Sequence, residues 1–255
     1  MDVKKGKSIV EYPIPLGKTP TFLVDKKRHL GTATHPYSIV TPYCTMHIVG
    51  ETLNTYDQSV VIAMLLDPII QDGKMGWRGT AYRLLKRVYP HRHPGNDDYT
   101  RLRASLTRLS NTTVFIEKPR SEKYLFDHNK VIFKKQPIIH YVEMETEKGK
   151  VKKIRVIFAT EFAEWAKQHL IGLIKLNIWN KLSPTGKALY TFLISQRGTR
   201  YTMSVLTRAL QIRFYRGRVR VKEKLAKQLQ ILQKEGIVEA YGFDNDTIWW
   251  KKAKC

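Results

Sequence analysis

The residues with the strongest chemical signal in this chain are basic, and they are concentrated between positions 213 and 227. Glu223 is the only acidic residue in that stretch, and the next acid is Glu235. One arginine can donate hydrogen bonds to both O6 and N7 of a guanine, which makes the contact base-specific. A lysine contact to phosphate mainly positions a protein on DNA. The pattern predicts a DNA-reading surface made of Arg213, Arg216, Arg218, Arg220, Lys222, Lys224 and Lys227.

An apolar series runs through the same stretch and gives it a helical period. At 100° per residue, Val221, Leu225, Leu229 and Leu232 fall on one side, opposite the basic residues. We therefore predict a long helix over residues 216–235, ended by Gly236, with a buried face and a basic face. A basic face of this kind is typical of a recognition helix in the major groove, although an ordinary solvated face is the alternative.

Patterns typical of catalysis are incomplete. His91 and His93 superficially resemble the paired histidines of rolling-circle nucleases, but Arg92 stands between them in a Pro/Gly loop, where those enzymes need an apolar residue on a strand. A phosphate-binding loop around Gly186-Lys187 would need glycine at 181 and serine or threonine at 188, where the chain has lysine and alanine. The two cysteines have no ligand spacing around them. We expect no catalytic residue, no metal and no cofactor.

The composition indicates a polyanionic partner. The chain has 255 residues and carries 45 Lys+Arg against 22 Asp+Glu, a formal charge of +23. No stretch approaches the roughly 18 apolar residues of a membrane span, and the basic N-terminus is not followed by the apolar segment of a signal peptide. We predict a cytoplasmic protein that binds nucleic acid and no membrane.

The first half of the chain reads as three helices followed by strands. We predict helices over residues 51–66 and 80–88 and a third capped by Asp97, then strands over 112–117, 130–133, 138–145 and 151–158. That is the order of a winged-helix domain, which we place at residues 36–178. In its third helix Arg101, Arg103 and Arg108 are candidate DNA contacts, although the domain's mixed charge suits dimerisation equally well. Residues 1–35, basic and rich in proline, are predicted to be a flexible tail.

The same order recurs in the second half. A helical connection over residues 161–179 is followed by helices beginning at Ser183–Pro184, at Met203 and at Arg216, and then by a hairpin over 237–241 and 247–251. Lys251 and Lys252 of this hairpin are predicted to contact DNA beside the recognition helix. The fold class is therefore α+β with two tandem winged-helix domains, the second at residues 179–255 and the main DNA-recognition unit.

One segment carries a family likeness. The run KLSPTGKALYTF from Lys181 to Phe192 resembles the start of the C-terminal winged helix of TrfA-like plasmid replication initiators, with Trp179 ahead of it, Tyr201 before the second helix and EGIV at 235–238 after the third. Gly50-Glu-Thr-Leu53 resembles the lead into that family's first winged helix. The resemblance implies an initiator that binds repeated origin sites (iterons), helps open adjacent DNA, acts without nucleotide hydrolysis and brings in a host initiator, the replicative helicase and the sliding clamp. It also implies a homodimer in equilibrium with monomers.

From these observations we predict a sequence-specific, double-stranded DNA-binding replication initiator of the plasmid type that is not an enzyme. Two alternatives remain open. A tandem winged-helix transcriptional repressor would use the same recognition face, and a rolling-circle type origin nuclease would use His91, His93 and a tyrosine.

Overall fold

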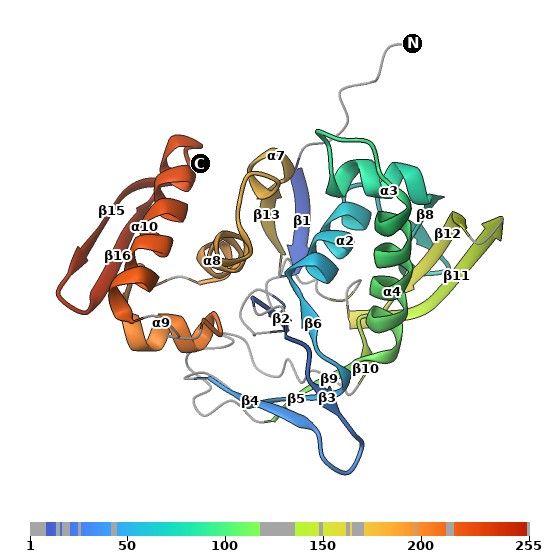
Figure 1. Cartoon of the computed structure of the whole chain (residues 1–255), viewed down its shortest axis with the longest axis horizontal. Coiled ribbons are helices and arrows are strands. Elements are labelled where there is room, and N and C mark those ends of the chain that lie inside the picture. Colours follow the sequence, from blue (N-terminus) through green and yellow to red (C-terminus); the bar gives the residue numbers. More distant parts are fainter. Residues whose placement is uncertain are drawn as a thin grey trace.

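The computed structural model describes residues 9–13, 16, 21–24, 27–41, 45–117, 136–147, 150–161, 164, 171–196, 198–212 and 217–253. Helices and strands are mixed along the chain, as predicted for the α+β class. The chain forms two halves, the first on the right and the second on the left of Figure 1. They meet where the helix Thr55–Leu65 of the first half packs against the helix Pro184–Ser195 of the second, and we call this contact the seam. The expected strand over 130–133 and the turn at 148–149 lie outside the described residues.

Three helices form one side of the first half: α2 (Thr55–Leu65), α3 (Ala81–Val88) and α4 (Asn96–Asn111). The first begins four residues later than predicted. Glu51 belongs to a strand, and Asn54 caps the helix by accepting hydrogen bonds from the amides of Tyr56 and Asp57. The third begins at Asn96, and its cap is Gly95, two residues before the predicted cap Asp97.

A four-stranded antiparallel sheet lies against these helices, in the order β11 (Ile139–Glu147), β12 (Lys150–Phe158), β8 (Lys74–Thr80) and β7 (Ile69–Gln71). The strand that precedes α3 therefore pairs with the second strand of the hairpin that follows α4. The sequence predicted that hairpin, but it gave no indication of β7 and β8, which lie between the first two helices.

A second sheet lies beneath the helices in Figure 1. Its strands are β10 (Gln136–Pro137), β9 (Thr113–Glu117), β5 (Thr45–Glu51) and β3 (Leu30–Gly31), and β4 (Tyr37–Val40) also pairs with β5. A short parallel pair joins β2 (Phe22–Leu23) to β6 (Leu53–Asn54), which leads directly into α2.

The prediction of a flexible tail was wrong for residues 9–13, 22–23 and 30–31, which form strands. Strand β1 (Ile9–Pro13) pairs antiparallel with β13 (Ile171–Lys175), and Val10 and Tyr12 are fully buried. The hydroxyl of Tyr12 accepts a hydrogen bond from Nε2 of Gln58 on α2. The same pairing corrects the helical connection predicted over 161–179, since residues 171–175 form a strand and only α7 (Leu176–Trp179) is helical among residues 171–179.

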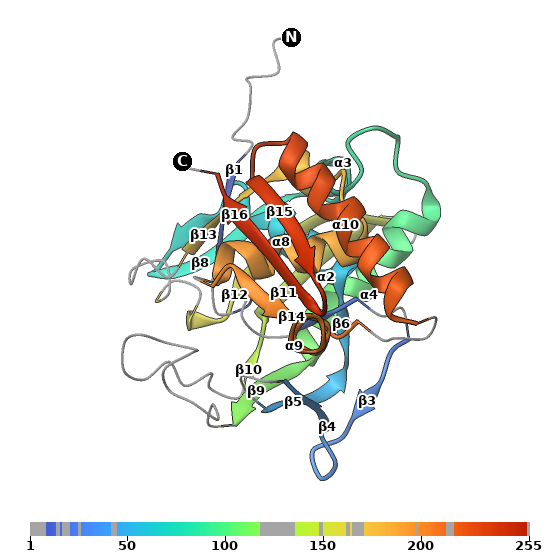
Figure 2. The same ribbon diagram turned by 90° about the vertical axis from the view of Figure 1, so that its left-hand side faces the viewer.

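The second half follows the predicted element order. Helix α8 (Pro184–Ser195) starts at the Ser183 cap with proline in its first turn, and α9 (Met203–Ala209) and α10 (Arg218–Lys234) follow. A hairpin of β15 (Val238–Asp244) and β16 (Thr247–Lys252) packs beside α10 (Figure 2). Strand β14 (Arg200–Thr202), which precedes α9, pairs with β16. This repeats the β8–β12 relationship of the first half.

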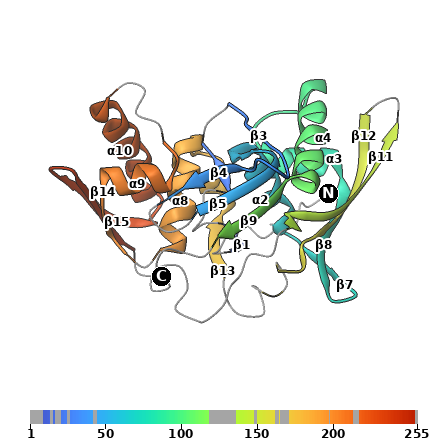
Figure 3. The same cartoon turned by 90° about the horizontal axis from the view of Figure 1, so that it is seen from below.

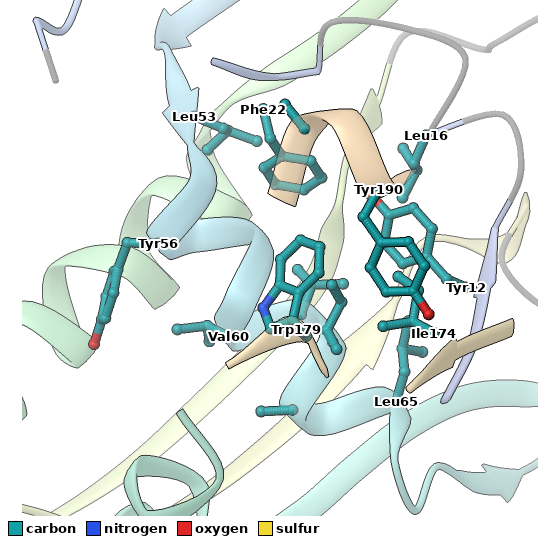
Figure 4. Packing of buried hydrophobic residues seen from close by; sticks show 14 of the residues in the cluster. Tyr12, Leu16, Phe22, Leu53, Tyr56, Val60, Leu65, Ile174, Trp179 and Tyr190 are labelled. Atoms are coloured by element: carbon teal, nitrogen blue, oxygen red, sulfur yellow. The ribbon is translucent and has the colours of Figure 1, made fainter. Parts of the chain in front are cut away.

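The hydrophobic core is continuous through both halves, and aromatic residues fill it at the seam. In Figure 4 the Trp179 indole lies among Val60, Ile174 and Tyr190. Trp179, from α7, is fully buried and donates from its indole nitrogen to Oγ of Ser59 on α2 at 3.2 Å. The phenol of Tyr190 on α8 accepts from the amide of Lys175. The hydrogen bond between Trp179 and Ser59 thus connects α7 to α2 inside the shared core.

Candidate nucleic-acid interface

Helix α10 has the two faces that its sequence predicts. Val221, Leu225, Leu229 and Leu232 are at most 5% exposed and pack into the core. Gly217 precedes the helix at φ 83°, a conformation that other residues rarely adopt, and Gly236 follows it at φ 70°. The prediction of the buried face and of the glycine stop is confirmed. The opposite face, at the same time, is exposed to solvent along the helix.

The exposed face of α10 carries Arg220, Lys222, Lys224 and Lys227. Within the described part of the chain, no carboxylate forms an ion pair with any of these four side chains. A surface rich in unpaired cations is suited to neutralising phosphates. Arg213 and Arg216 lie outside the described residues, and Arg218 is described only as the first residue of the helix.

The hairpin meets the basic face near its own turn. Nζ of Lys222 lies 5.0 Å from the ring centroid of Phe243, which is near the end of β15. The strands then reverse at Asn245, at φ 52°. The hairpin tip therefore flanks the first turns of α10, where a wing could extend a DNA footprint.

The two hairpin lysines predicted as DNA contacts lie at the other end of the strands. Lys252 pairs with Val238 at the base of the hairpin, and its Nζ donates to the carbonyl of Gln196 at 2.5 Å. Partial burial lowers the pKa of Lys252. Lys251 is exposed but ion-paired with Glu239 at 2.7 Å. The prediction placed both beside the recognition helix. They lie instead near its C-terminal end, because the hairpin tip, not its base, accompanies the N-terminal turns.

Sequence reasoning missed Val219. This residue is 70% exposed in the first turn of α10, directly beside Arg220. Apolar side chains in a major-groove helix can contact the methyl group of thymine. The sequence indicated it only indirectly, because Val219 is an apolar residue that lies outside the buried helical series and between Arg218 and Arg220.

The three arginines of α4 divide by environment. Arg101 and Arg103 are exposed, and the Arg101 guanidinium lies 4.0 Å from the centroid of the Tyr56 ring. Arg108 is different, since its side chain is only 11% exposed and its Nη2 contacts Oδ1 of Asp57 at 2.9 Å. Asp57 is fully buried and also accepts from Ser105 at 2.6 Å. This is a correction to the prediction of Arg108 as a DNA contact, because its charge is engaged in the core.

The loop that contains His91 and His93 is organised by Arg92. Its guanidinium makes two hydrogen bonds of 2.6 Å to the carboxylate of Asp98, and this holds the pKa of Asp98 below its usual range. No group of three or more His, Cys, Asp and Glu side chains suited to a metal ion occurs in the described part of the chain. No helix in that part is long and apolar enough to cross a membrane.

Comparison with known proteins gives a fold and no family. No protein-family model and no curated protein matches the chain, so the resemblance to TrfA-like initiators is not confirmed. Two solved structures are similar. Domains 2 and 3 of RctB, as a selenomethionine derivative, match with a TM-score of 0.58 at 11% identity, covering 96% of this chain and 99% of that chain. The structure of RctB-155-483, again domains 2–3, matches with a TM-score of 0.56 at 11% identity, covering 92% and 95%. The chain shares the fold of RctB domains 2–3.

Proposed function

We propose that this protein is a sequence-specific DNA-binding replication initiator of the plasmid type, built from two tandem winged-helix units. The single observation that carries the proposal is the exposed face of α10, where Arg220, Lys224 and Lys227 project without a carboxylate partner among the described residues. RctB, whose domains 2 and 3 share this fold, is a replication initiator.

The topology of both halves supports the winged-helix assignment. In each half a strand before the second helix pairs with the last strand of the hairpin after the third helix, β8 with β12 and β14 with β16. That arrangement presents the third helix, α4 or α10, with a wing beside it. Figure 3 shows α4 and α10 on the same side of the molecule, so one duplex could engage both.

The other parts of the proposal rest on the family resemblance in sequence. They are the binding of iterons, the opening of adjacent DNA, the recruitment of a host initiator, helicase and clamp, and a dimeric form. We propose that the protein acts in the cytoplasm without catalysis of its own, since the histidine pair and the Gly-Lys step lack the patterns that cleavage or nucleotide hydrolysis would need.

The function is tested on two levels. The full chain, titrated at fixed salt with duplexes from the DNA flanking its gene, should bind direct repeats at least tenfold more tightly than scrambled duplexes. The gene with that flanking DNA should then let an otherwise non-replicating circle persist in the host. Preference for repeats without persistence would favour a transcriptional repressor. Metal-dependent cleavage of single-stranded origin DNA would favour a nuclease instead.

A further inference from the structure

A lysine is partly buried in the seam between the two halves. Lys187, on α8, directs its Nζ to Oγ of Ser59 on α2 at 3.0 Å. The same nitrogen lies 5.1 Å from the centroid of the Trp179 ring. Ser59 also accepts the hydrogen bond from the Trp179 indole, so one hydroxyl serves two donors. The cation is thus held by a hydroxyl and an aromatic face.

The charge of Lys187 is not offset by an ion pair in the described part of the chain. Among the described residues no carboxylate pairs with its ammonium group, and the charge that acts on it most is that of Arg101, which has the same sign. Desolvation, followed by that repulsion, lowers the pKa of Lys187 to about 8. Burying a cation without a counterion is unfavourable, so the binding of a ligand that supplied negative charge here would be favourable.

The second cation of the seam is held in a similar manner. The guanidinium of Arg101, on α4, stacks on the Tyr56 ring at 4.0 Å and donates to the hydroxyl of Tyr89 at 3.4 Å. Its side chain is exposed, and within the described residues no carboxylate pairs with it. Stacking on an aromatic ring fixes a planar guanidinium while leaving its outward N–H groups available.

The location of these two cations relates to the proposed DNA surface. Along the long axis of the molecule, α8 and α2 lie between α10 and α4 in both Figure 1 and Figure 3. Helix α8, which carries Lys187, thus lies between the two third helices, and Arg101 belongs to one of them, α4. A duplex that engaged both helices would pass over the seam and bring its sugar–phosphate backbone to it.

We propose that Lys187 and Arg101 together bind a backbone phosphate of duplex DNA at the seam between the two halves. The inference rests on the proposed function for the presence of DNA, and it adds a contact that belongs to neither third helix alone. Because the contact is to phosphate, it strengthens binding to any sequence and leaves sequence preference unchanged.

The test uses the full chain and the variant Lys187→Met, which keeps the length of the side chain and removes its charge. Binding to repeat and to scrambled duplexes is measured over a range of salt concentrations. We expect weaker binding to both duplexes by a similar factor, and a slope of log K against log salt that is shallower by about one. Lys181→Met is the matched control, because Lys181 is an exposed lysine of the same half that is already paired with Glu235, and it should leave the slope unchanged.

A second measurement is made first on the wild type. Calorimetric titration of the wild type with DNA near pH 8, in buffers of different ionisation enthalpy, should show net proton uptake, because a bound phosphate favours the charged form of Lys187. Lys252→Met, at the other depressed lysine, should retain that uptake. Absence of proton uptake, or equal salt slopes for wild type and Lys187→Met, would overturn the inference.

Two further outcomes separate the explanations. If inorganic phosphate stabilised the wild type but not Lys187→Met, while the DNA slopes stayed equal, the site would take free phosphate and the assignment to DNA would be wrong. If the wild type showed no preference for the repeats, the proposed function would fail. The slopes on scrambled duplex would nevertheless still decide the seam contact.

Discussion

Asp57 and Arg108 form a buried ion pair that joins the first and third helices of the first half, with 2.9 Å between Oδ1 and Nη2. The Asp57 carboxylate also accepts from Ser105 and from the backbone amide of Asn54, and Arg28 approaches its second oxygen at 3.4 Å. One fully buried carboxylate thus binds α2, α4 and the segment before β3 together. The pair contributes to the orientation of α4, the helix that carries Arg101 and Arg103.

Removing one partner of this pair should destabilise the fold. Asp57→Ala removes the buried anion that Arg108 and Arg28 share and leaves them, among the described residues, only the partly exposed Glu51. It should lower the free energy of unfolding by about 3–5 kcal/mol. Chemical denaturation measures the loss. Arg103→Ala on the exposed side of α4 is the control and should change stability by less than about 0.5 kcal/mol. Equal effects of the two variants would contradict the buried network.

The buried face of α10 makes a separate stability prediction. Leu225 is fully buried, so Leu225→Ala should lower the free energy of unfolding by about 2–5 kcal/mol through loss of burial and cavity formation. Lys224→Ala, the adjacent exposed position, should be nearly neutral. A stable Leu225→Ala protein would mean that the core contact of α10 lies elsewhere.

Arg220 and Lys224 should differ in what they contribute to DNA binding. Arg220→Ala is expected to reduce binding to the repeat by about 1–3 kcal/mol more than binding to scrambled DNA, since a paired contact to guanine is base-specific. Lys224→Ala should weaken both by a similar factor. Titrations at one salt concentration measure the ratio. An unchanged ratio in Arg220→Ala would remove this arginine from the base-reading set.

Val219 predicts a contact that can be tested one methyl group at a time. Replacing thymines of the repeat by deoxyuridine removes only the C5 methyl. For wild type, at least one such replacement should weaken binding, and Val219→Ala should lose sensitivity at that same position. Sensitivity that persists in Val219→Ala would assign the methyl to a different side chain.

The depressed pKa of Lys187 makes the stability of the fold depend on pH. The pKa of Lys187 is about 8 in the folded protein, against an ordinary value of 10.5, so between these pH values the unfolded chain binds more protons. Stability therefore rises with pH through this window, by at most about 1.4 kcal/mol per pH unit. Lys187→Met should lack this rise. Denaturation at pH 8, 9 and 10 checks it, and parallel curves for both proteins would contradict it.

Local periodicity predicted the three helices and the hairpin of the second half, but not strand β14. The α10 faces, the Ser183–Pro184 start of α8 and the Gly236 stop follow from interactions within a few residues. Contacts between residues that lie far apart in the sequence could not be predicted from local periodicity. Arg108 reads as a surface arginine because its partner Asp57 lies on another helix, and Lys187 reads as part of a failed nucleotide motif because the seam is formed by α2 and α7. Residues 171–175 read as helix because their strand partner is at residues 9–13.

The pairing of β1 with β13 has a consequence for how the protein acquires its structure. The two strands are among the most widely separated partners in the sequence, yet Val10 and Ile174 lie opposite each other in the buried layer of the seam. Closing such a long loop costs conformational entropy, so the pairing forms slowly, and the stabilising contacts appear only once the loop is closed. During synthesis on the ribosome, β1 emerges first but has no partner until residues 171–175 follow. The first half therefore completes its core only when the chain has reached the second, which couples the maturation of the two halves in time.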